Sequence, residues 1–197
     1  YAIDAQIRIQ TKQKGGIIMK PIGPLMWEHR LIEKMLSFFE GATKKIMERN
    51  KVDPLFVDTA VDFIRTYADR THHGKEEDIL FRDLIKKPLS QEHTRTMEEL
   101  VEEHKYARNT VGRLVDAKQR YLKGENTLQE VVILLNELAH FYPKHIEKED
   151  KHFFYPCMDY FTREEQDRML TEFYEFDRNM IHEKYRKIVD QVKAQFV

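Results

Sequence analysis

The sequence predicts an all-α protein, an up-and-down antiparallel four-helix bundle followed by one additional C-terminal helix. Apolar residues recur at steps of three and four along five segments, and helix-breaking signals separate those segments. Of the 197 residues, 34% are charged and 41% apolar, with few Gly and Pro. This composition is typical of a soluble helical protein.

The first two helices are expected over residues 23–50 and 54–86. Asp53 is predicted to cap the second helix, with Pro54 at its first position. One face of the first helix carries Leu25, His29, Ile32, Leu36 and Phe39. The corresponding face of the second carries His73, Glu77, Leu80 and Leu84. Both faces therefore combine apolar residues with potential metal ligands.

The third helix should begin at a Ser90 cap, and its buried face is expected to hold Met97, Leu100, His104, Ala107, Val111 and Leu114. Thr127 and Glu130 form a predicted capping box that opens the fourth helix. The face of that helix reads Leu128, Val131, Leu135, Leu138, Tyr142, His145, Glu149 and His152. Pro143 lies inside it and should bend its axis near the polar end of this face.

A second predicted capping box, Thr162 with Glu165, begins a fifth helix that runs to about Gln195. Its apolar face is expected to comprise Leu170, Phe173, Ile181, Tyr185, Ile188 and Val192. The chain thus divides into residues 1–18, interpreted as an expression leader before a start at Met19, a bundle over 19–160, and a C-terminal helix over 161–197. That helix should pack on the bundle or on a partner.

Composition excludes several classes of function. The formal charge of −1 provides no basic field for nucleic acid, and no apolar run is long enough for a membrane span. A single cysteine, Cys157, excludes an intramolecular disulfide and a thiolate metal framework. The sequence therefore favours a reducing, cytoplasmic location.

Four histidines are spaced so that each turn falls midway between neighbours. These are His29, His73, His104 and His145, and the midpoints near residues 51, 88 and 124 coincide with helix-breaking sequences. In an antiparallel bundle, residues equally far before and after a turn lie at the same height. The spacing therefore predicts that all four histidines meet at one level.

Two of these histidines begin an H-x-x-x-E pair, His73 with Glu77 and His145 with Glu149. Each pair places both side chains one helical turn apart, within reach of a common ion. A buried group of imidazoles and carboxylates is costly unless a cation holds it. Imidazole and carboxylate ligands without thiolates favour iron or manganese, with zinc as a substitute, and six ligands suit two ions better than one. The predicted ligands are His29, His73, Glu77, His104, His145 and Glu149.

Over about residues 20 to 160, the chain resembles the hemerythrin-like, HHE cation-binding domains. The resemblance lies in the ligand order, in the segment Glu28-His29-Arg30-Leu31-Ile32-Glu33 and in the segment from His73 to Phe81. The resemblance implies a non-heme di-iron centre with an oxo or hydroxo bridge and bridging carboxylates from Glu77 and Glu149. Oxygen-carrying hemerythrins place a second histidine one turn after the third-helix ligand, where this chain has Arg108. The six-ligand version is closer to the iron-centre repair and iron-sensing members.

The sequence leaves three ligand assignments open. His72 with Glu76 could replace His73 with Glu77, Asp150 could replace Glu149, and His152 could be an additional ligand or lie behind the ligands.

Two functions are compatible with the predicted site. The first is a protein that binds or reacts with oxygen, nitric oxide or peroxide at the two irons. The second is an iron sensor or reservoir with metal-dependent stability and no turnover. The sequence leaves open whether the protein is an enzyme. The expected partners are a small diatomic molecule or peroxide, with a homodimer or a redox partner as further candidates, and neither nucleic acid nor membrane.

Overall fold

The computed structural model describes residues 20–195, with side chains described up to residue 180 and at Lys184. The segment interpreted as a leader, residues 1–18, lies outside the described residues. So do the side chains of the last four positions of the predicted C-terminal apolar face, Ile181, Tyr185, Ile188 and Val192.

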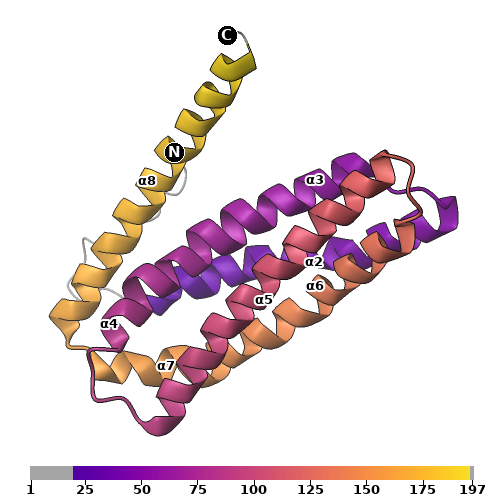
Figure 1. Ribbon diagram of the computed structural model, residues 1–197. Coiled ribbons are helices and arrows are strands. Elements are labelled where there is room, and N and C mark those ends of the chain that lie inside the picture. Colours follow the sequence, from indigo (N-terminus) through magenta and orange to yellow (C-terminus); the bar gives the residue numbers. More distant parts are fainter. Residues whose placement is uncertain (1–19, 196–197) are drawn as a thin grey trace.

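Four long helices form an antiparallel up-and-down bundle, and a fifth follows it (Figure 1). The first is α2 (Ile22–Arg49) and the third is α5 (Gln91–Leu122). The second consists of α3 (Pro54–Phe63), η1 (Ile64–His73), η2 (Glu76–Phe81) and α4 (Arg82–Leu84). The fourth consists of α6 (Leu128–Lys148), η3 (Glu149–Phe153) and α7 (Phe154–Cys157). A short turn, η4 (Met158–Tyr160), leads to α8 (Arg163–Gln195). The predicted fold class is confirmed.

Most of the predicted caps are present. Asp53 Oδ1 accepts a hydrogen bond from the Phe56 N–H at 3.2 Å, and Ser90 Oγ accepts one from the His93 N–H at 3.1 Å. Thr162 and Glu165 form the reciprocal capping box, with bonds of 2.9 and 3.3 Å. These local signals therefore define the starts of the second, third and fifth helices.

The capping box predicted at Thr127 is wrong. The Thr127 side chain makes no cap bond, because its buried hydroxyl donates to the Ala117 carbonyl of α5 at 2.7 Å. Glu130, its predicted partner, instead accepts a hydrogen bond from Arg120 at 2.5 Å. Tertiary partners on α5 thus replace the local ones that the sequence pattern indicated.

The second and fourth helices are not regular α-helices, although the sequence predicts them as such. The segments η1, η2 and η3 are π-helical, with hydrogen bonds that span five residues instead of four. At the end of η1, for example, the Gly74 N–H bonds to the Asp69 carbonyl. The wider turns change which side chains of these segments face the interior.

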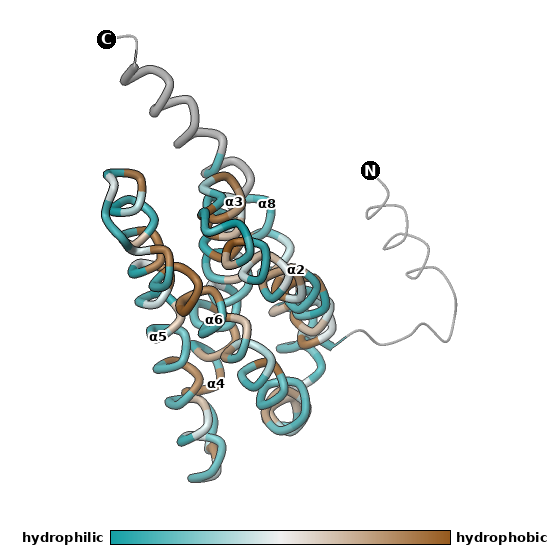
Figure 2. Tube along the Cα trace, turned by 90° about the vertical axis from the view of Figure 1, so that its right-hand side faces the viewer, coloured by the Kyte–Doolittle hydropathy of each residue, from teal (hydrophilic) through white to brown (hydrophobic). Residues whose placement is uncertain are grey.

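A buried polar layer divides the apolar core of the bundle into two parts. One part is larger and includes Ile32, Leu36, Ala107, Leu135 and Leu138; the other includes Ile22, Leu25, Leu80, Leu100 and Phe153. On every helix of the bundle, a histidine or glutamate lies between the residues of the two parts. Figure 2 shows the alternation of hydrophilic and hydrophobic residues along these helices. The polar layer is therefore enclosed by apolar packing on both sides.

Among the described residues, none of the helices combines the length and the apolar character needed to cross a bilayer.

We expect Leu135→Ala to lower the free energy of unfolding by about 2 to 5 kcal/mol, because it opens a cavity at a side chain that is fully buried. Urea unfolding followed by circular dichroism measures this change. The matched control is Ile133→Ala on the same helix, whose side chain is 59% exposed, and its effect should stay within about 0.5 kcal/mol. Equal losses in the two variants would contradict the core assignment.

Candidate metal centre

The polar layer contains five histidines and two glutamates, all at most 2% exposed: His29, His72, His73, His104, His145, Glu76 and Glu149. Their rings lie against one another, with centroid distances of 4.4 Å for His29 and His72 and 3.8 Å for His73 and His104. The ring of His145 lies 5.0 Å from that of His104. Side chains from all four helices of the bundle therefore meet at one level.

Each glutamate faces histidines on two sides. Glu76 Oε1 lies 3.3 Å from His72 Nε2, and its Oε2 lies 3.4 Å from His104 Nε2. Glu149 Oε2 lies 3.1 Å from His29 Nε2, and its Oε1 lies 3.3 Å from His145 Nε2. The two carboxylates thus span the space between one group of histidines and the other.

All five histidines turn their Nδ1 atoms outward to a carboxylate. His29 Nδ1 lies 2.7 Å from Asp150, and His72 Nδ1 lies 2.9 Å from Glu28. The remaining three pairs are His73 with Asp69 at 3.4 Å, His104 with Glu77 at 2.7 Å and His145 with Glu103 at 2.8 Å. A carboxylate accepts only from a protonated Nδ1, so in the neutral imidazole these bonds leave the Nε2 lone pair directed inward. This is the tautomer that a metal ligand requires.

Cations lie behind these carboxylates in turn. Arg108 donates to both Asp69 and Glu77 at 2.7 Å, so one guanidinium holds the partners of two histidines. Lys148 donates to Glu103 at 2.6 Å. Asp150 pairs with Arg30, and Glu28 pairs with the buried Lys75. The outer carboxylates are therefore charge-compensated and remain good acceptors for the imidazoles.

Inside the layer, polar atoms are buried without hydrogen-bond partners. These are both oxygens of Glu76 and of Glu149 and the Nε2 atoms of His29, His72, His104 and His145. Lone pairs of imidazole nitrogen facing lone pairs of carboxylate repel one another at 3.1 to 3.7 Å. Buried groups of this kind are stable only when protons or cations lie between them.

The donor atoms fit metal cations. Ligands held at about 2.1 Å from one ion lie about 3 to 4 Å apart, which is the spacing observed here. Two groups have donor atoms that all lie within 4.8 Å of one another and could each hold an ion: His73, His104 and His145, and His29, His72, Glu76 and Glu149. Because each carboxylate has one oxygen toward each group, the residues fit two neighbouring ions with two shared carboxylates.

The structure brings together five of the six predicted ligands: His29, His73, His104, His145 and Glu149. It does not bring Glu77 into the cluster. Glu77 Oε1 instead accepts hydrogen bonds from His104 Nδ1 and from Arg108 outside the layer. Glu76 occupies the place predicted for Glu77, so the expected bridging role of Glu77 does not fit its position.

His72 and His73 both face the interior, although the sequence pattern predicts only one of them there. In a regular α-helix, adjacent side chains diverge and only one of them faces the core. Here the wider turns of η1 and η2 bring both imidazoles and Glu76 inward. Backbone hydrogen bonding of this kind leaves no clear periodic signal in the sequence, which is why the register was open.

The other open assignments are also resolved geometrically. Asp150 lies behind His29 and not between the donor groups. His152 is exposed, since η3 ends the regular helical period after Glu149. The outer carboxylates Glu28, Asp69 and Glu103 were not predicted. The signal available for Asp69 was its position four residues before His73, whereas Glu28 and Glu103 depend on tertiary neighbours.

A small cavity of about 60 Å³ lies beside His73, lined also by Ile64, Arg65, Asp69, Ala107, Arg108, Val111 and Tyr142. The Tyr142 hydroxyl is buried and has no hydrogen-bond partner. Burial raises the pKa of Tyr142, so the phenol stays protonated and available as a donor. Asp69 and Arg108 are partly exposed, so the cavity lies between the surface and the polar layer.

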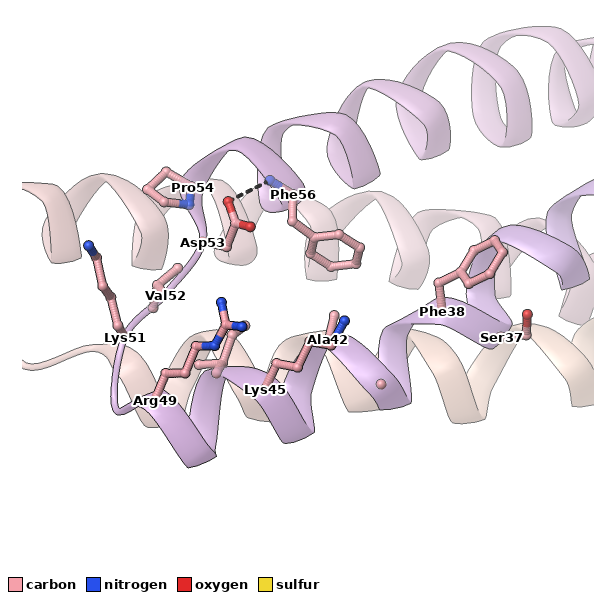
Figure 3. A pocket seen from close by; sticks show the side chains of 12 residues that line it. Ser37, Phe38, Ala42, Lys45, Arg49, Lys51, Val52, Asp53, Pro54 and Phe56 are labelled. Atoms are coloured by element: carbon pink, nitrogen blue, oxygen red, sulfur yellow. Dashed lines mark hydrogen bonds between the residues drawn. The ribbon is translucent and has the colours of Figure 1, made fainter.

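A larger cavity of about 570 Å³ lies at the turn between α2 and α3, away from the polar layer. Figure 3 shows Phe38, Lys45, Arg49 and Lys51 around it, none of which belongs to the histidine and glutamate cluster. The size of a cavity therefore does not identify the candidate site. The chemistry of the buried donor atoms identifies it.

The family model for the hemerythrin HHE cation binding domain matches residues 21–157. The chain belongs to this family, and the matched residues contain the whole polar layer. Neither a curated protein nor a solved structure matches the chain. The helix α8 begins after the matched segment.

Metal loading should release protons at neutral pH. Burial opposes the charging of His29, but its bonds to Asp150 and Glu149 outweigh this and raise its pKa to about 9. Burial and the charge of Glu149 raise the pKa of Glu76 well above its ordinary value. A cation displaces these protons, so its apparent affinity should increase as the pH is raised toward 9. Calorimetry in two buffers of different ionisation enthalpy measures the release, and buffer-independent heats would contradict it.

Proposed function

We propose that the polar layer holds two iron ions, one in each donor group. His73, His104 and His145 would hold the first, and His29 and His72 would hold the second, with Glu76 and Glu149 shared between them. The observation that supports this most directly is the set of inward-facing nitrogens and carboxylate oxygens that are buried without partners. Imidazole with carboxylate and no thiolate is the ligand chemistry that non-heme iron prefers, with manganese or zinc as substitutes.

The two donor groups differ in number, which supports an open position on one side. The first group offers three imidazoles and the second offers two, and the same two carboxylates serve both. An ion with fewer protein ligands has room for an external molecule. When bound, the iron pair would supply electrons and Lewis acidity to a small molecule such as oxygen, nitric oxide or peroxide.

The surrounding residues support a small molecule as the ligand. Apolar residues enclose the layer above and below, which favours a small molecule at the open position. The cavity beside His73 has room for only a few heavy atoms, and it borders the three-imidazole group and not the group of His29 and His72. Tyr142 offers a protonated hydroxyl to a molecule in this cavity. The outer carboxylates keep the imidazoles in their ligand tautomer without occupying the inner space.

A second candidate function is an iron sensor or reservoir whose stability depends on the metal. A series of polar contacts favours this function. The contacts run from His72 through Glu28 and Lys75 to Asp177 on the C-terminal helix. Such a link couples the ligand layer to an element at the surface of the bundle.

Two adjacent glutamates allow a sharp test of the proposed ligand set. Glu76→Gln should reduce bound iron from two ions to at most one per chain and abolish the visible absorption of the iron pair, because it removes the shared carboxylate. Glu77→Gln should retain both ions, with affinity weakened roughly 10- to 100-fold through the loss of the acceptor behind His104. Elemental analysis and absorption spectra measure both effects. Two ions and an unchanged spectrum in Glu76→Gln would contradict the proposal.

Rapid mixing distinguishes the two functions. Reduced, iron-loaded protein mixed with oxygen, nitric oxide or peroxide should give an absorption change whose rate depends on the concentration of that molecule. Repeated turnover with an added reductant supports an enzyme, and stable binding supports a carrier. If none of the three changes the spectrum while the melting temperature still rises with iron, the sensor or reservoir function is supported instead.

A further inference from the structure

Lys75 is a fully buried lysine in the helical turn between His73 and Glu76. A buried ammonium is destabilising unless carboxylates surround it. Lys75 has two carboxylate partners, Glu28 of α2 and Asp177 of α8, the latter at 2.7 Å. Its ammonium also lies 6.0 Å from the centre of the Phe173 ring of α8. The C-terminal helix therefore completes the environment of this lysine.

The same lysine is connected to the donor layer. Glu28 contacts Lys75 through Oε1 and accepts from His72 Nδ1 through Oε2, at 2.9 Å for the second contact. His72 Nε2 in turn lies 3.3 Å from Glu76 Oε1. A continuous series of polar contacts thus runs from Asp177 on α8 through Lys75 and Glu28 to the inward-facing nitrogen of His72.

Packing joins α8 to the same turn. A Cβ atom added at Gly74 would lie 2.7 Å from Cζ of Phe176, so this side chain of α8 packs directly on the backbone between His73 and Lys75. Further along, α8 runs antiparallel to the second helix, with Glu172 near Arg82 at 2.8 Å and Lys184 near Asp62 at 3.3 Å. The packing contact at Gly74 and the ion pair at Lys75 are two independent observations that α8 docks on the same turn of the second helix.

We propose that Lys75 and Asp177 are positioning residues of the metal centre, and that docking of α8 and metal binding by His72 stabilise each other. This inference rests on the proposed function, because it concerns the same metal. Lys75 and Glu28 lie inside the family match at residues 21–157 and Asp177 lies outside it, so the coupling joins the matched domain to the helix that follows. Reciprocity follows from thermodynamic linkage: if α8 strengthens metal binding, metal strengthens α8 docking.

The test compares two substitutions on α8 that each remove one carboxylate charge from an ion pair with the second helix. Asp177→Asn breaks the pair with Lys75, whereas Glu172→Gln breaks the pair with Arg82, which does not contact the donor layer. Zinc is the probe metal, because it has no redox chemistry, and competition with a chelating dye gives its affinity. We expect affinity to fall roughly 10-fold or more in Asp177→Asn and to change less than about 2-fold in Glu172→Gln.

Hydrogen exchange on the full chain provides the second readout. Amides of α8 around Phe173 and Phe176 should exchange more slowly in the zinc-loaded protein than in the metal-free protein, and Asp177→Asn should abolish most of that difference. Gly74→Ala, which displaces Phe176 without changing a charge, should weaken zinc binding in the same direction. Circular dichroism verifies that each variant is folded.

The outcomes separate this inference from the function on which it rests. A wild-type chain that binds neither zinc nor iron would overturn the metal centre itself. A second outcome would overturn only the coupling. In that case the chain binds metal with normal stoichiometry, Asp177→Asn and Glu172→Gln have equal zinc affinities, and zinc does not change the hydrogen exchange of α8.

Discussion

The structure depends on an electrostatic constraint at the centre of the bundle. Two buried carboxylates, Glu76 and Glu149, face the Nε2 atoms of surrounding imidazoles at 3.1 to 3.7 Å, and only protons or cations between these atoms relieve the repulsion of their lone pairs. Such an arrangement is unfavourable for a protein alone and favourable around cations. The site interrupts the apolar core on all four helices at one level, so apolar packing is lost there. The two apolar regions on either side exclude water from the site.

Alternating charge around the layer explains how it can be buried. Each imidazole has a carboxylate behind it, and these carboxylates have cations behind them, from Arg30, Lys75, Arg108 and Lys148. Arg108 is the clearest case, because its planar guanidinium holds Asp69 and Glu77 at once, which a lysine could not do in the same geometry. Arg108 therefore holds the carboxylate partners of two buried histidines, His73 and His104.

Local sequence signals predicted the elements well. The caps at Asp53, Ser90 and Thr162 and the apolar periodicity located the helices, because capping and burial of one face act over a few residues. Equal spacing of the histidines about the turns predicted that the four helices bring polar groups to one level, since antiparallel helices joined by short turns keep their heights. The exception is Thr127, where a carbonyl of the neighbouring helix α5 competes with the local cap.

The sequence by itself therefore determined the fold class, the level of the polar layer and five of the side chains that meet in it, which follow from periodicity and spacing. Only the tertiary structure decided that Glu76 and not Glu77 faces inward and that His72 and His73 both do, because π-helical turns rotate these side chains away from the regular period. The partners Glu28, Glu103 and Asp177 likewise come from other helices. Contacts between elements depend on how helices are rotated against one another, and a one-dimensional pattern does not specify that rotation to within one residue.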